Sequence, residues 1–129
     1  MPSYGSIIPA QSLSTVPTTV WNAETPTPGS GGASASAQVG IAGSAIDRRG
    51  FPVDGKFASA PGAFEVDVQV AASDSDTKYQ TIANGNVTSV DSVNNAFHLD
   101  APNVIARYVR LLMRTRTNSV AVTAYITGA

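Results

Sequence analysis

The sequence contains no cysteine, which excludes disulfide bonds, thiolate zinc sites and a cysteine nucleophile. Charged residues make up only 13% of the 129 residues, against an average of about 25% in soluble proteins. There is a single histidine, and the formal net charge is −1. A surface so poor in charge is typical of a subunit that its neighbours cover, and neither nucleic acid nor a membrane is expected as a partner.

Targeting signals are also missing from the sequence. The first ten residues, MPSYGSIIPA, lack the basic start and the long apolar run of a signal peptide. No window approaches the ~18 apolar residues of a membrane span. Together with the lack of cysteine, this pattern favours a protein made in a reducing cytoplasm.

The composition divides the chain into two parts. Residues 1–62 hold seven of the eight prolines, and the run Thr25–Ala37 (TPTPGSGGASASA) is of low complexity. Such a segment cannot bury a core by itself. It predicts an extended Pro/Gly/Ser-rich N-terminal arm with loops over residues 1–62 and a β-sandwich core over residues 63–129. The arm could also contribute strands to the same single domain.

Period-two alternation predicts strands in the second part. Residues 64–70 (FEVDVQV) alternate apolar and polar side chains, as in a strand with one buried and one exposed face. Further short strands are expected at residues 79–83, 87–90 and 97–100, the first two separated by the turn formers Asn84-Gly85-Asn86. No long segment has a 3.6-residue period, so an all-β fold is predicted, a single jelly-roll-like antiparallel β-sandwich.

The last two strands are predicted to form a hairpin. Residues 107–117 (RYVRLLMRTRT) and 120–127 (VAVTAYIT) flank Asn118-Ser119, a plausible tight turn. The alternation directs Val109 and Leu111 to the core and Tyr125 away from it.

Three groups of side chains have the composition of a chemical site. His98 would have to serve any Ser-His-Asp triad, but the nucleophile-elbow motif is missing. Glu65 and Asp67 share a strand face about 7 Å apart, a spacing that suits a glycosidase pair, although two carboxylates on an exposed face are the ordinary finding. Asp74 and Asp76 lie in a turn that would either bind calcium or form an Asx turn. No catalytic constellation results, so no enzyme and no cofactor are expected.

The candidate partner-contact residues are Ile7, Ile8, Trp21, Arg110, Arg114 and Arg116. The three arginines share one strand face, where they would either form bidentate pairs with an acidic partner or remain solvated on an edge strand. The tryptophan is the only one in the chain. It is either an interface residue of the hot-spot type or, the preferred alternative, a core residue.

Two resemblances to known families follow from these features. The segments Ser73–Tyr79 (SDSDTKY) and Ala106–Arg110 (ARYVR) resemble the turn and the late strand of galactose-binding, discoidin-like jelly rolls, over roughly residues 63–128. The Pro/Gly-rich arm together with the terminal strand TAYITG (Thr123–Gly128) is similar to tailed-phage head proteins of the cement or decoration type.

The second resemblance implies a structural virion protein that binds the outside of an icosahedral phage head and stabilises its shell. Its partners would be the major capsid protein and other copies of itself, as a dimer or trimer. The chain would be made in the host cytoplasm and reside on the capsid exterior. Deleting residues 2–38 would then leave the sandwich folded but weaken shell binding. The alternative is a carbohydrate-binding module or a fibre or tail adhesin domain on the same sandwich.

Overall fold

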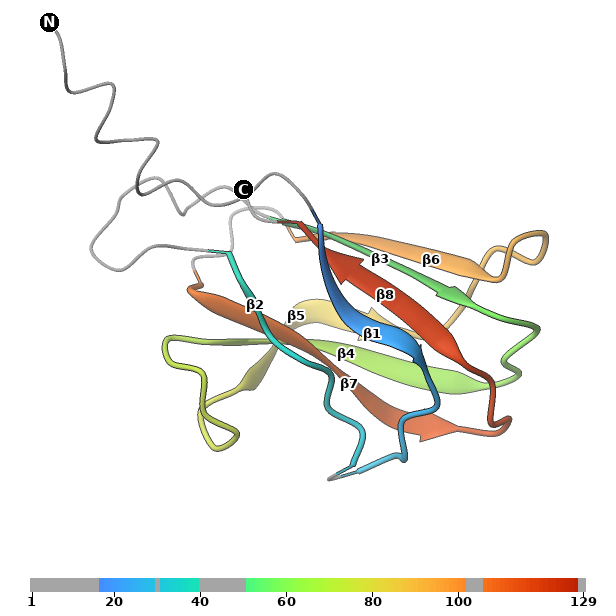
Figure 1. The fold of residues 1–129 in the computed structure, drawn as a ribbon, viewed down its shortest axis with the longest axis horizontal. Coiled ribbons are helices and arrows are strands. Elements are labelled where there is room, and N and C mark those ends of the chain that lie inside the picture. Colours follow the sequence, from blue (N-terminus) through green and yellow to red (C-terminus); the bar gives the residue numbers. More distant parts are fainter. Residues whose placement is uncertain (1–16, 30, 40–50, 102–105, 128–129) are drawn as a thin grey trace, which may run out of the picture.

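The computed structural model describes residues 17–29, 31–39, 51–101 and 106–127. These residues form no helix and eight β-strands, arranged as two facing antiparallel sheets (Figure 1). The strands are β1 (Thr18–Glu24), β2 (Ala37–Gln38), β3 (Phe51–Phe57), β4 (Phe64–Ala71), β5 (Gln80–Val87), β6 (Ala96–Ala101), β7 (Tyr108–Arg116) and β8 (Val122–Ile126). The predicted all-β sandwich is confirmed.

The order of the strands is β1-β8-β3-β6 in one sheet and β2-β7-β4-β5 in the other. The first strand pairs with the last, the second with the seventh, the third with the sixth and the fourth with the fifth. This nested pairing arises when one long antiparallel hairpin, with the β4–β5 connection at its tip, is rolled around a core. The β3–β8 and β4–β7 ladders join neighbouring turns of the roll. Eight strands in two sheets with this order form a jelly roll.

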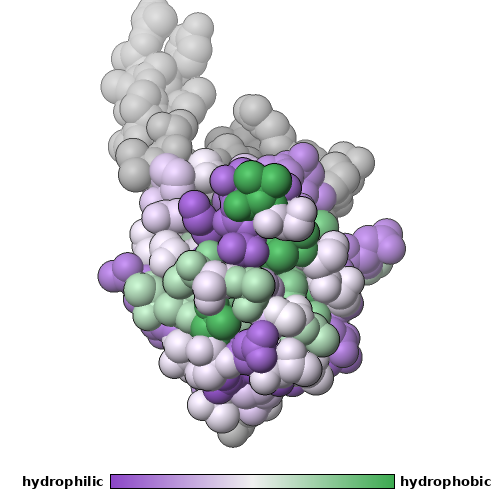
Figure 2. Space-filling view, turned by 90° about the vertical axis from the view of Figure 1, so that its right-hand side faces the viewer, coloured by the Kyte–Doolittle hydropathy of each residue, from purple (hydrophilic) through white to green (hydrophobic). Residues whose placement is uncertain are grey.

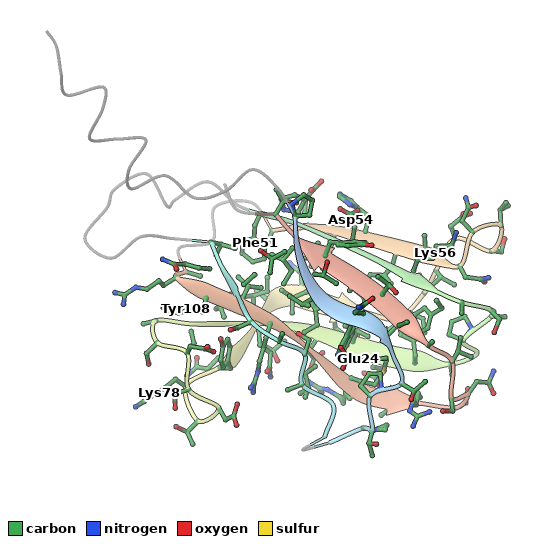
Figure 3. All side chains as sticks on the ribbon, viewed as in Figure 1. Glu24, Phe51, Asp54, Lys56, Lys78 and Tyr108 are labelled. Carbon is green, nitrogen blue, oxygen red and sulfur yellow. The ribbon has the colours of Figure 1, made fainter. Side chains whose placement is uncertain are left out.

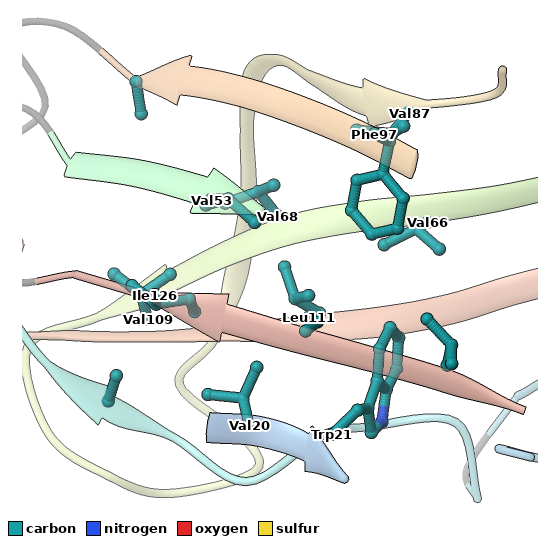
Figure 4. Close-up of a cluster of buried hydrophobic side chains, with 14 of the residues drawn as sticks. Val20, Trp21, Val53, Val66, Val68, Val87, Phe97, Val109, Leu111 and Ile126 are labelled. Atoms are coloured by element: carbon teal, nitrogen blue, oxygen red, sulfur yellow. The ribbon is translucent and has the colours of Figure 1, made fainter. Parts of the chain in front are cut away.

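The core lies between the sheets, where the inward-facing side chains of the two sheets meet (Figure 4). In β7, Val109, Leu111 and Met113 are fully buried, as the alternation predicts. The rings of Phe57 and Phe64 meet across the core with their centroids 4.9 Å apart. Burying one such side chain stabilises the fold by about 1.5–3 kcal/mol, so both sheets depend on this shared interior.

Strands from both sides of residue 62 build the one sandwich. β1, β2 and β3 all lie before that residue, and Trp21 and Val53 are fully buried in the core. The sequence left open this contribution of strands by the N-terminal part. A deletion of residues 2–38 would remove β1, β2 and Trp21, so the expectation that the sandwich would survive that deletion is not tenable.

The described residues of the low-complexity run lie against β7 and do not form a free arm. The amide of Met113 donates to the carbonyl of Gly32 (2.9 Å), and the amide of Ser34 donates to the carbonyl of Leu111 (2.8 Å). A Cβ atom on Gly32 would collide with the Met113 carbonyl. Small residues therefore allow the irregular backbone to approach the strand closely.

The predicted terminal hairpin is wrong, because β7 and β8 belong to different sheets. The backbone between them bonds to the β3–β4 connection. The amide of Thr117 donates to the carbonyl of Ala63 (2.9 Å), and the amide of Ala58 donates to the carbonyl of Ala121 (2.9 Å). The two connections therefore cross side by side from one sheet to the other. Both strands keep the predicted inward faces, since either arrangement satisfies the same alternation.

The predicted turn at residues 84–86 is also wrong, since β5 continues through it to Val87. The pairing register shifts there: Asn86 pairs with Asp67, whereas Thr81 pairs with Gln69. Asn84 adopts a left-handed conformation, with φ of 60°. The same tolerance of positive φ that favours Asn and Gly in turns here produces a bulge within one strand.

Candidate functional site

Of the three arginines expected on one face of β7, Arg110 and Arg114 make contacts within the chain on its outer face. Arg116 does not share that face, because a register shift in the β4–β7 ladder places it opposite the buried Phe64.

Arg110 donates from Nε to Gln69 Oε1 (3.0 Å) and from Nη1 to Asp76 Oδ1 (2.8 Å). Its guanidinium also lies 4.2 Å from the centre of the Tyr79 ring, within the range of a cation–π contact. The Arg110 side chain is only 11% exposed. It therefore presents little charge to a partner.

Asp67 forms the centre of a second polar cluster on the same outer face. Its side chain is fully buried and accepts hydrogen bonds from Arg114, at 2.8 Å from Nε and also from Nη2, and from Asn86 Nδ2 at 2.7 Å. The carboxylate raises the pKa of Arg114. The expectation of an exposed pair of carboxylates is wrong for Asp67, because these donors enclose it. Glu65 bonds separately to Asn86 and Thr115.

The Asp74–Asp76 turn directs its two carboxylates to different protein donors. Asp74 accepts from Tyr79 Oη (2.7 Å) and from Ser36 Oγ (2.9 Å), while Asp76 pairs with Arg110. Burial and, next, the Asp74 hydrogen bond raise the pKa of Tyr79 to about 12. Among the described residues no cluster of three or more His, Cys, Asp or Glu side chains that could hold a metal ion is found, and both carboxylates of this turn already accept hydrogen bonds from protein donors.

The other outer sheet face carries the only histidine. His98 of β6 contacts Asp54 of β3 through Nδ1 (2.5 Å) and Asp100 through Nε2 (3.0 Å), and its side chain is half exposed. The hydrogen bond to Asp54 is the main cause of its raised pKa, and Asp100 adds to it. With a carboxylate on each ring nitrogen, neither nitrogen is left to accept a proton from a hydroxyl nucleophile in this conformation.

A shallow depression lies beside His98 on the face of the β1-β8-β3-β6 sheet. It has a volume of about 630 Å³, and its polar lining residues are Asp54, Lys56, Asp91, His98, Thr123 and Tyr125. Figure 3 shows Asp54 and Lys56 on this sheet, whereas Lys78 and Tyr108 belong to the opposite side of the sandwich. The depression is the part of the described surface that combines an exposed aromatic ring with several ionisable groups.

The six expected contact residues are therefore not brought together. Ile7 and Ile8 lie outside the described residues. Trp21 belongs to the core, the alternative preferred from the sequence. The outward direction of Tyr125 could be read from the alternation along residues 122–126. Its approach to Asp54 could not, because it depends on pairing between strands far apart in sequence.

Comparisons with known proteins give no match to a family model, to a curated protein or to a solved structure. Within the described part of the chain, no helix is long and apolar enough to cross a membrane.

Proposed function

We propose that the chain is a structural virion protein, which binds the outside of an icosahedral phage head and stabilises the major capsid shell as a cement or decoration protein. The supporting observation is a jelly roll with few charged residues, several of which form ion pairs with one another. The ion pairs of the described residues are Arg110–Asp76, Arg114–Asp67, and His98 with both Asp54 and Asp100.

A neutral exterior favours association because little charge has to be desolvated. Protein interfaces are depleted of charged residues at their centres, and an ionised group buried without a partner is strongly unfavourable. Here the formal net charge is −1. Figure 2 shows one end of the molecule, where pale, weakly polar side chains cover much of the surface and strongly hydrophilic ones are scattered. Such a surface supports contact with protein rather than with nucleic acid or a membrane.

Stabilisation of the shell would be mechanical and thermodynamic, with no enzymatic step. Copies of the chain, as a dimer or trimer, would straddle neighbouring shell subunits and bind the assembled state preferentially. A ligand that binds only one state stabilises it by about 2.7 kcal/mol at a hundred times its Kd. Several weak contacts on one oligomer would add to its retention. Ile7 and Ile8 remain the proposed apolar contacts N-terminal to β1.

Sedimentation with purified heads of the encoding phage tests this proposal. The full chain is expected to form a stable oligomer and to sediment with expanded heads, and to bind unexpanded heads less. Removing residues 2–16, which precede β1, is expected to leave the sandwich folded and to weaken head binding. A monomer at about 100 µM that stays in the supernatant with both kinds of head would overturn the proposal, since useful avidity needs a lower Kd.

The second candidate is a carbohydrate-binding module, or a fibre or tail adhesin domain, on the same sandwich. One specific observation favours it, namely the depression beside Tyr125 on the β1-β8-β3-β6 sheet.

A further inference from the structure

A continuous row of side chains crosses the floor of this depression. Tyr125 of β8 lies directly opposite Asp54 of β3, and Asp54 lies directly opposite His98 of β6. Side chains at directly opposed positions have Cβ atoms about 4.5–5.5 Å apart. The sheet register therefore brings an aromatic ring, a carboxylate and an imidazole side by side on three strands.

Two polar side chains at the depression have no partner within the described part of the chain. Tyr125 is 41% exposed, and neither its hydroxyl nor the ammonium of Lys56 makes a hydrogen bond or ion pair with another described residue. Lys56 lies opposite Thr123, one row along from Tyr125. An exposed ring with a free hydroxyl, next to a free ammonium, leaves both donors available to a ligand.

The imidazole, by contrast, is fixed in place. Asp54 and Asp100 hold the two ring nitrogens of His98 at 2.5 and 3.0 Å. Each carboxylate has more acceptor positions than one hydrogen bond uses. The row therefore offers hydrogen-bond acceptors that are already oriented before a ligand arrives, and pre-organisation of this kind reduces the entropic cost of binding.

The presence of charges of both signs at the depression favours a neutral ligand. Asp54 and Asp91, with Asp100 on the other ring nitrogen of His98, lie beside the positive charges of Lys56 and, when protonated, His98. An anion would meet the two carboxylates, and a cation would meet the ammonium. A neutral polyol avoids both costs, because its hydroxyl groups donate to carboxylates and accept from the ammonium.

We propose that this depression binds one ring of a neutral saccharide, with Tyr125 packed on the apolar C–H face of the sugar. The ring hydroxyls would bond to Asp54 and Lys56, and the depression of about 630 Å³ lies within the usual 300–1,000 Å³ range of small-molecule sites. The site is open to solvent, so the rest of a longer glycan can extend away from the sheet. The inference rests on the second candidate function, a carbohydrate-binding module, and does not depend on head binding.

NMR of the full chain, labelled with ¹⁵N, tests this site. The probes are the methyl glycosides of glucose, galactose, mannose and N-acetylglucosamine, each added to about 50 mM, because a ring of about a dozen non-hydrogen atoms in an open site binds in the millimolar range. At least one probe is expected to shift the amides of residues 54–56, 97–99 and 123–125. The amides of β4 and β7, on the opposite sheet, are expected to stay in place.

Three variants separate stacking from general loss of structure. Tyr125→Ala is expected to weaken binding at least about tenfold, and Tyr125→Phe less than about threefold, since the ring face is kept. The matched control is Tyr108→Ala, which removes a tyrosine from the opposite sheet and is expected to leave binding unchanged.

Three outcomes would overturn the inference. The first is that no probe moves these amides. The second is equal binding by the wild type and by a correctly folded Tyr125→Ala variant. The third is that glucuronate binds while the neutral glycosides do not, since that would assign the site to an anion held by Lys56. None of these results bears on head binding, which sedimentation measures separately.

Discussion

Replacing Trp21 gives a quantitative test of the packing between the two sheets. The side chain is fully buried in the core, on an edge strand whose pairing with β8 has two register shifts. Truncating a buried tryptophan to alanine costs about 3–5 kcal/mol. A domain of this size is stable by about 5–15 kcal/mol. Trp21→Ala is therefore expected to remove a large part of the stability, although the strand itself remains.

The phenylalanine variant should behave very differently. The indole Nε1 is buried and has no hydrogen-bond acceptor among the described residues, and such an unpaired donor costs about 1–3 kcal/mol. Phenylalanine is smaller by about 40 Å³, which at about 24 cal/mol per Å³ of cavity costs about 1 kcal/mol. The two terms oppose each other. Trp21→Phe is thus expected to lie within about 1 kcal/mol of the wild type.

Urea unfolding followed by circular dichroism measures both variants, because tryptophan fluorescence is lost in each. With a slope of about 1–3 kcal/mol per molar urea, a loss of about 4 kcal/mol moves the midpoint by about 2 M. Val93→Ala is the control, since Val93 is 82% exposed and should change stability by less than about 0.5 kcal/mol. If the phenylalanine variant were as unstable as the alanine variant, removal of the unpaired indole N–H would not offset the cost of the cavity. If the alanine variant were as stable as the wild type, Trp21 would not be a buried core residue.

Three further predictions concern titration. Asp54→Asn is expected to lower the pKa of His98 more than Asp100→Asn does, because the Asp54 hydrogen bond is the largest cause of its elevation; NMR of the chain's only histidine measures this, and the reverse order would contradict it. Because the pKa of His98 is raised in the folded state, its interaction with the carboxylates stabilises the fold fully below the ordinary pKa of 6.5. This stabilisation is lost as the pH rises through the raised pKa of the folded state. Asp54→Asn should therefore destabilise more at about pH 5 than at about pH 8, and an equal loss in urea unfolding at both would exclude this linkage. Asp74→Asn is expected to lower the pKa of Tyr79 from about 12, which an ultraviolet absorbance titration detects as ionisation at lower pH; no change would show that burial alone sets it.

The inward and outward faces of the strands could be predicted because they depend on local sequence. A period of two is imposed by the pleat itself, whichever strand lies alongside. The alternation in β7 therefore predicted burial of Val109, Leu111 and Met113 correctly. It also directed Tyr125 outward, and the structure leaves that ring exposed.

The pairing partners could not be predicted in the same way. A hairpin between β7 and β8 and a crossover between sheets bury the same residues, so the alternation does not distinguish them. The choice between them depends on the β3–β4 connection, which accepts a hydrogen bond from the amide of Thr117 and donates one to the carbonyl of Ala121. At residues 84–86 the composition predicted a turn, but the positive φ that Asn84 adopts serves a bulge as well as a turn.

The candidate site lay beyond sequence reasoning for the same reason. Asp54 and His98 are 44 positions apart, and only the pairing of β3 with both β6 and β8 places them in one row with Tyr125.

The outer position of Arg110 and Arg114 was visible in the sequence, but their partners were not, and neither was the register shift that takes Arg116 off that face. Asp67 lies 47 positions before Arg114, and the local pattern of FEVDVQV makes that aspartate look solvent-exposed.

The two outer sheet faces use similar residue types to opposite effect, and this difference bears on where a ligand can act. On the β7 side, a tyrosine lies against Arg110, which also binds Gln69 and Asp76, so a ligand would have to break these contacts before it gained any. On the β8 side, Tyr125 and Lys56 have no described partner to lose. Recognition by the sandwich itself is therefore expected on the β1-β8-β3-β6 face, while the outer face of β7 stabilises the fold.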